Sequence, residues 1–171
     1  MKRREAIQNI GLLGIGVTLL PACQWQEEGP VYANVPLEKG QRTLLEIVTK
    51  ALFPTEGTEV QTPESTTDFI LTMLNDCASP EDIQKYTRGI KDFQETVKSQ
   101  FNTSFKQLDA SQRKTFFSSI ANSETASDNL KHFFNTTAGM SRWHFTSSEY
   151  FMKKYRDFEF APGRYIGCRE V

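Results

Sequence analysis

The sequence has few of the residues from which metal and haem sites are built. Among its 171 residues are two histidines, His132 and His144, and three cysteines. No CxxC, HxxxH or CxxCH spacing occurs, so the patterns typical of zinc sites and of covalent haem attachment are absent. Because His144 lies between Trp143 and Phe145, we interpret it as a core or interface histidine and not as a metal ligand.

Other catalytic patterns and a strong net charge are also missing. The sequence has no GxGxxG or P-loop pattern to hold nucleotide phosphates, and no GxSxG element around a nucleophilic serine. Its formal net charge is −1, so binding of nucleic acid through its phosphates has no electrostatic support. We therefore expect no cofactor on this chain, no nucleic-acid partner and no catalytic activity of its own.

Long hydrophobic runs are absent, and the one short run lies near the N-terminus. Gly11–Leu20 is too short to cross the roughly 30 Å hydrocarbon core of a bilayer. It follows the basic segment Lys2–Arg4 and precedes the small residue Ala22, which is typical of a secretory signal peptide over residues 1–22. The alternative is a buried amphipathic helix, which three glycines and the lack of a polar face disfavour.

Two further features refine the predicted signal peptide. Leu20-Pro21-Ala22-Cys23 resembles the lipobox of bacterial lipoproteins, in which the cysteine is acylated and becomes the new N-terminus. We therefore expect a lipid on Cys23 and a protein anchored at the bacterial envelope, on the periplasmic side or in the outer membrane. Arg3 and Arg4 resemble a twin-arginine signal, which exports folded proteins, but paired arginines also serve general export.

The two remaining cysteines are Cys77 and Cys168. In an oxidising compartment they could form a disulfide that closes a loop of about 90 residues, worth roughly 4 kcal/mol in the chain-entropy model. The alternative is two separate thiols, with Cys77 buried as a small apolar residue. Both arrangements stay open, because the sequence does not show whether the two sites meet.

Beyond the signal peptide, the chain divides into a tether and a domain. Residues 23–36 are polar with scattered prolines, so we expect a tether there and a helical domain over residues 37–171. No alternating runs of β-branched residues occur, which predicts an all-α fold, a small bundle of about five or six helices. The segment from Asp157 to Val171 is rich in aromatic residues and glycine, and we expect an ordered, non-helical tail.

Apolar spacing and capping residues place the predicted helices. Pro54 ends the first helix, and Ser65 or Thr66 begins the second. Ser79–Asp82 combines a hydroxyl cap, a first-turn proline and two acids, and so begins the third. Asp109 begins the fourth, and two more follow over roughly 130–143 and 148–155.

The third predicted helix has the clearest apolar seam. Its residues recur at spacings of three and four, as expected for packing against another helix. The seam consists of Ile83, Tyr86, Ile90, Phe93, Val97 and Phe101. Gly89 lies in the middle of this helix and would allow a close crossing.

Aromatic residues gather near the C-terminus, with Arg156 and Arg164 between them. Tyr, Phe and Arg are enriched where proteins meet, which favours a partner interface here, although packing of the tail on the bundle explains the pattern equally well. The candidate interface residues are Tyr150, Phe151, Tyr155, Pro162, Gly163 and Tyr165.

Several motifs together resemble a known family. After the paired arginines come Leu52-Phe53-Pro54 at the end of a helix, FTSSE at 145–149, and PGRYIGC at 162–168, the most specific of the three. This order is similar to that of the small third subunit of bacterial gluconate 2-dehydrogenase, a family related to small subunits of other membrane-associated sugar dehydrogenases. The similarity extends over most of residues 1–171, although the middle matches only in pattern.

The resemblance implies an accessory role. In such complexes a large flavoprotein of the glucose-methanol-choline (GMC) type holds FAD and oxidises the sugar, and a cytochrome c subunit often carries the electrons onward. The small subunit supplies the export signal and stabilises the flavoprotein. Carried over here, Arg3 and Arg4 would serve export, residues 162–168 would shape the tail, and the lipid on Cys23 would anchor the complex.

Two other hypotheses compete with this one. The chain could be a free-standing helical envelope lipoprotein that binds a small ligand or another envelope protein. It could also be an autonomous hydrolase or metalloenzyme, which would lose activity when His132 or His144 is changed; we expect no such activity.

Overall fold

A computed structural model describes residues 31–38, 40–53, 60, 62–159 and 163. Within these residues the chain forms six α-helices, one turn of 3-10 helix and no strand, which confirms the predicted all-α fold. The elements are α2 (Gln41–Leu52), α3 (Thr66–Cys77), α4 (Pro80–Phe101), η1 (Phe105–Gln107), α5 (Ala110–Ala121), α6 (Asp128–Thr146) and α7 (Glu149–Arg156). Most of the predicted ordered tail lies outside the described residues.

Side-chain caps fix where most of these helices begin. In each case an oxygen of the cap accepts a hydrogen bond from a backbone N–H in the first turn, which would otherwise lack a partner. The caps are Ser65, Ser79, Asp109, Ser127 and Ser148. The predicted starts at Ser79 and Asp109 are confirmed, and Ser65 rather than Thr66 caps α3. The helix α2 differs, because it follows Gly40 at φ 89° without any side-chain cap.

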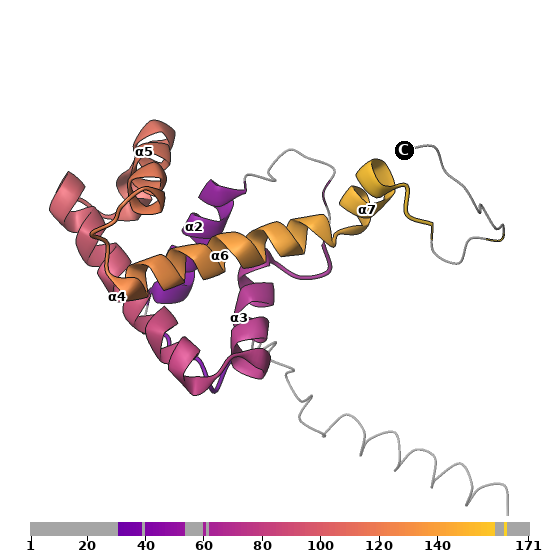
Figure 1. Ribbon diagram of the computed structural model, residues 1–171, viewed down its shortest axis with the longest axis horizontal. Coiled ribbons are helices and arrows are strands. Elements are labelled where there is room, and N and C mark those ends of the chain that lie inside the picture. The colour runs from indigo at the N-terminus through magenta and orange to yellow at the C-terminus, as the bar shows by residue number, and fades with distance from the viewer. Residues whose placement is uncertain (1–30, 39, 54–59, 61, 160–162, 164–171) are drawn as a thin grey trace, which may run out of the picture. The chain divides into compact units, whose positions relative to one another are not determined.

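The crossing of α4 and α6 organises the bundle (Figure 1). Gly89 lies at this crossing, as the sequence predicted. A Cβ at this position would lie 2.2 Å from the backbone oxygen of Asn129 and 2.5 Å from Cβ of Phe133. Only glycine therefore fits, and its absent side chain lets the two helices approach at this point.

Aromatic side chains fill the centre of the bundle. Tyr86, Phe93, Phe116 and Phe133 are fully buried, and they come from α4, α5 and α6. The ring of Phe93 meets those of Phe116 and Phe133 edge to face, with centroids 5.2 and 5.3 Å apart, and Phe133 meets Tyr86 at 5.1 Å. Such pairs add roughly 0.5–1.5 kcal/mol each beyond the burial of apolar area. The apolar seam predicted for α4 is therefore the centre of the core.

The segment before α2 packs on the domain, which corrects the predicted end of the tether at Pro36. Val35 is 3% exposed, and the backbone N–H and side-chain amide of Asn34 both bond to Asn75 in α3 at 2.9 Å. The hydroxyl of Tyr32 bonds to the carboxylate of Asp68 at 3.1 Å. These residues resemble a tether in composition, because asparagine and proline are typical of loops, but tertiary contacts fix them. The predicted tether, which ends at Pro36, therefore includes residues that belong to the folded domain.

The predicted signal peptide over residues 1–22, with Arg3 and Arg4, and the predicted lipidation site Cys23 lie outside the described residues, so these predictions stay predictions. In the part of the chain that is described, none of the helices has the length and apolar character needed to cross a bilayer.

Candidate partner interface at the α6–α7 corner

The corner between α6 and α7 is held by Ser148. Its hydroxyl donates a hydrogen bond to the backbone oxygen of Phe145 at 2.7 Å and accepts one from the backbone N–H of Phe151 at 3.2 Å. Ser148 is itself buried, at 6% exposure. Because one side chain ends the first helix and begins the second, the corner brings Phe145 and Phe151 together, with ring centroids 5.4 Å apart.

A row of aromatic rings, here called the aromatic strip, runs across this corner. Successive ring centroids along it are 6.4, 5.4, 5.2 and 6.3 Å apart, within the range of favourable aromatic contacts. In order, its members are Phe53, Phe145, Phe151, Tyr155 and Tyr150. The strip therefore joins the C-terminal end of α2 to α7 through the last turn of α6.

The strip becomes more exposed along α7. No residue of α7 is buried, Tyr155 is 59% exposed, and Phe158 just beyond the helix is 49% exposed. The ammonium group of Lys154 lies 4.8 Å from the ring centre of Tyr150 and 2.7 Å from its hydroxyl oxygen. Large exposed aromatic side chains beside cationic groups are the kind of surface through which proteins bind partners.

A second aromatic cluster lies nearby on α3 and α6. The ring of Trp143, 51% exposed, meets the ring of Phe69 edge to face at 5.3 Å. On the same Phe69 ring stacks the imidazole of His144, at 4.9 Å, and its Nδ1 lies 3.1 Å from the hydroxyl oxygen of Thr66. His144 is 7% exposed, which confirms the predicted core histidine. Burial lowers its pKa below the ordinary 6.5, and the carboxylate of Glu64 partly opposes that shift.

The structure brings together only some of the predicted interface residues. Tyr150, Phe151 and Tyr155 lie side by side on α7, and Gly163 is exposed. Pro162 and Tyr165 lie outside the described residues. The sequence interpretation missed Trp143 and Phe53, and no local pattern marks Phe53, because only the fold brings it to Phe145. Trp143 could have been found as a large aromatic residue directly before a buried position of α6.

The histidine, cysteine and acidic side chains of the described residues do not form a metal site. It contains no group of three His, Cys, Asp or Glu side chains placed to hold a metal ion. The burial expected for Cys77 as a separate thiol is wrong, because this residue ends α3, where the last turn meets solvent, and is exposed. Cys168 lies outside the described residues, so their pairing stays a prediction. His132 has a buried Nε2 with no hydrogen-bond partner among the described groups.

An all-α domain with an aromatic corner does not by itself define a class of protein, and comparison with known proteins supplies the class. The model of the family "Gluconate 2-dehydrogenase subunit 3" matches residues 39–163, and the chain belongs to this family. The family is named for a subunit of a dehydrogenase, which fits an accessory subunit of an oxidoreductase complex with a catalytic partner. No curated protein and no solved structure matches the chain.

Proposed function

We propose that this chain is a non-catalytic accessory subunit that escorts, stabilises and anchors a GMC-type, FAD-dependent sugar or alcohol dehydrogenase. Family membership over residues 39–163 carries the proposal, because the family is named for a dehydrogenase subunit. FAD would be held by the partner, since dinucleotide phosphates are bound by a glycine-rich loop that this sequence lacks. A cytochrome c subunit would complete some complexes of this kind.

The aromatic strip and the nearby Trp143 together offer a surface to which the flavoprotein could bind. Burying Tyr155 and Trp143, each about half exposed, would remove apolar area from water at about 25 cal/mol per Å². Three basic residues of the last turn of α7, Lys153, Lys154 and Arg156, would favour an acidic rim on the partner. The partner would therefore contact α7 and the outer face of the last turns of α6.

The N-terminal residues would supply export and anchoring. In this proposal Arg3 and Arg4 direct the chain and its folded partner out of the cytoplasm, and acylated Cys23 holds the complex at the envelope membrane. One acyl chain binds a membrane only marginally, so stable anchoring requires a second acyl chain or a second membrane contact within the complex.

Purification from membranes tests the proposal. The tagged full-length chain should recover a larger, yellow protein whose absorbance spectrum is that of FAD. Recovery of the small chain alone, under conditions that keep membrane dehydrogenase complexes intact, would refute the proposal.

Two substitutions test the position of the interface. Trp143→Ser and Tyr155→Ser should each weaken recovery of the flavoprotein about tenfold or more, because truncating an interface aromatic often costs 2 kcal/mol or more. Both side chains are about half exposed, so the small subunit should remain folded. Lys114→Ser, at an exposed position on α5, is the matched control and should leave recovery unchanged. Equal recovery with all three variants would place the interface elsewhere.

A further inference from the structure

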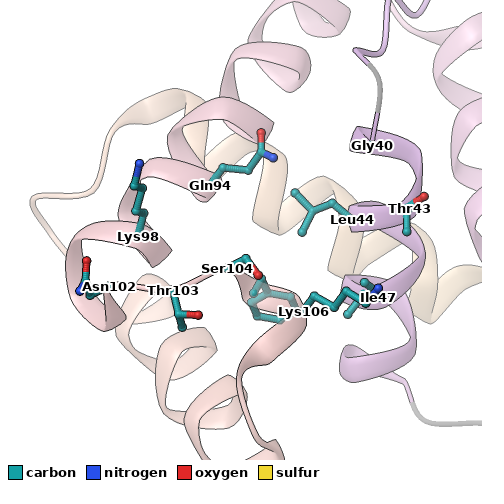
Figure 2. A pocket seen from close by; sticks show the side chains of 11 residues that line it. Gly40, Thr43, Leu44, Ile47, Gln94, Lys98, Asn102, Thr103, Ser104 and Lys106 are labelled. Carbon is teal, nitrogen blue, oxygen red and sulfur yellow. The ribbon is translucent and has the colours of Figure 1, made fainter.

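A groove separates α2 from the C-terminal end of α4 and η1, away from the aromatic strip (Figure 2). Its volume is about 590 Å³, within the roughly 300–1,000 Å³ typical of small-molecule sites. Leu44 and Ile47 of α2 and Phe105 of η1 are the apolar residues of its lining. Leu44 points from α2 toward α4 in the view of Figure 2. The groove therefore offers an apolar bed for a hydrocarbon chain.

The wall formed by η1 is fixed by local contacts. Gln107 accepts hydrogen bonds from the side chains of Thr103 and Ser104. The guanidinium of Arg113 in α5 lies over the ring of Phe105, 5.3 Å from its centre, and donates to the backbone oxygen of Lys106 at 3.1 Å. Because these contacts order the wall without a ligand, binding in the groove would not have to order it.

The charged side chains among the described residues that line the groove are both cationic. Lys98 and Lys106 line it, no carboxylate is among its lining residues, and neither ammonium group has an ion-pair partner in the described part of the chain. Figure 2 shows the side chain of Lys106 extending toward Ile47, so a cation lies at the edge of the apolar wall. Such a rim would attract the anionic end of a ligand whose other end is apolar.

From this combination of an apolar bed with two lysines that have no ion-pair partner among the described residues, we propose that the α2–α4 groove binds a single-chain anionic amphiphile, such as a long-chain carboxylate. The hydrocarbon chain lies against Leu44, Ile47 and Phe105, and the carboxylate lies beside Lys98 and Lys106. The amide and hydroxyl groups of Gln94 and Thr43 complete the rim. This site is separate from the aromatic strip, and it does not depend on the proposed dehydrogenase partner.

Titration with fatty carboxylates tests the site. The full chain carrying Cys23→Ser, which cannot be acylated, is titrated with octanoate, decanoate and dodecanoate below their micelle concentrations. We expect one saturable site whose affinity rises by up to about fourfold for each added methylene. Dodecyl maltoside, with a similar chain and an uncharged head, should bind at least about tenfold more weakly than dodecanoate. Equal affinity for both heads, or no saturable binding, would overturn the proposal.

Substitutions and methyl NMR locate the bound chain. Reversing both rim charges with Lys98→Glu and Lys106→Glu should weaken dodecanoate binding about tenfold, whereas Lys114→Glu, an exposed control on α5, should not. Dodecanoate should shift the methyl signals of Leu44 and Ile47 but not that of Ile83, which lines a different surface hollow. Equal shifts at Ile83 would show non-specific binding.

A last measurement distinguishes a protein occupant from the amphiphile. If the Leu44 and Ile47 methyl signals shift on adding the co-purified flavoprotein, while dodecanoate shifts neither in the free chain, the groove is a protein interface and the proposal is wrong.

Discussion

At position 89 the missing side chain decides how closely α4 approaches α6. The atoms nearest a would-be Cβ are the backbone of Asn129 and the first side-chain carbon of Phe133, neither of which can rotate away. Glycine normally costs a helix interior about 1 kcal/mol relative to alanine. Glycine is nevertheless required at position 89, because α6 occupies the space that a Cβ would fill.

Gly89→Ala should therefore destabilise the protein by about 1–3 kcal/mol, the usual range for overpacking. Gly139→Ala is the matched control, since Gly139 lies in α6 and, apart from its own helix backbone, none of the described atoms lies within 4 Å of its would-be Cβ. That change should stabilise the protein by up to about 1 kcal/mol through helix propensity. Urea denaturation of both variants measures the difference, and a stabilising Gly89→Ala would contradict the close crossing.

His144 makes the stability of the fold depend on pH. Because its folded-state pKa lies below 6.5, the unfolded chain takes up a proton first as the pH falls. This contribution to stability is thus fully present above pH 6.5 and is lost progressively below it, until the folded state is protonated as well. The free energy of unfolding should accordingly fall more steeply between pH 6.5 and 5 in the wild type than in His144→Gln. An identical pH dependence of the two proteins would contradict this role.

At the scale of elements, Ser127 links the start of α6 to α4. Its hydroxyl oxygen accepts a hydrogen bond from the backbone N–H of Leu130 at 3.1 Å and donates one to the carboxylate of Asp92. Ser127→Ala should cost about 1–2 kcal/mol, because it removes both a helix cap and a bond between helices.

Ser99→Ala is the matched control for Ser127→Ala. Ser99 is exposed in α4, and among the described residues its hydroxyl bonds only to a backbone oxygen of its own helix, so its replacement should change stability by less than about 0.5 kcal/mol. Thermal unfolding followed by circular dichroism compares the two, and equal melting temperatures would show that the Ser127 cap contributes little.

The helices were predictable where their defining contacts lie within a few residues of one another in the sequence. Ser79 and Asp109 are caps whose hydrogen bonds reach three residues along the chain, and the seam from Ile83 to Val97 follows the helical period. The start of α2 was not marked by any polar cap, since Gly40 precedes it in a left-handed conformation.

Features that depend on tertiary contacts could not be predicted. Tyr32 and Asn34 have the composition of a linker, and only their bonds to α3 show that they belong to the domain. The α2–α4 groove combines residues about 60 positions apart, and no spacing rule connects them. Within the aromatic strip, Tyr150, Phe151 and Tyr155 were predictable as neighbours on one short helix, but Phe53 was not.

For the whole molecule, the proposed export signal is the part on which the proposed partner would depend most. Replacing Arg3 and Arg4 by lysine keeps the charge of the basic segment but removes the paired guanidinium groups of a twin-arginine signal. Fractionation of cells should then find both this chain and the flavoprotein retained in the cytoplasm. Unchanged export of both proteins would indicate the general pathway and leave the lipid on Cys23 as the predicted contribution of this segment.

The central position of α6 has a consequence for how the protein is made. The helices α2, α3, α4, α5 and α7 all contact α6, yet α6 follows four of them in the sequence. On the ribosome, the apolar faces of α2 to α5 therefore emerge before the helix that covers them, and the core cannot close until Thr146 has been synthesised. The N-terminal residues that we expect to direct export are thus available to the export machinery well before the domain has folded.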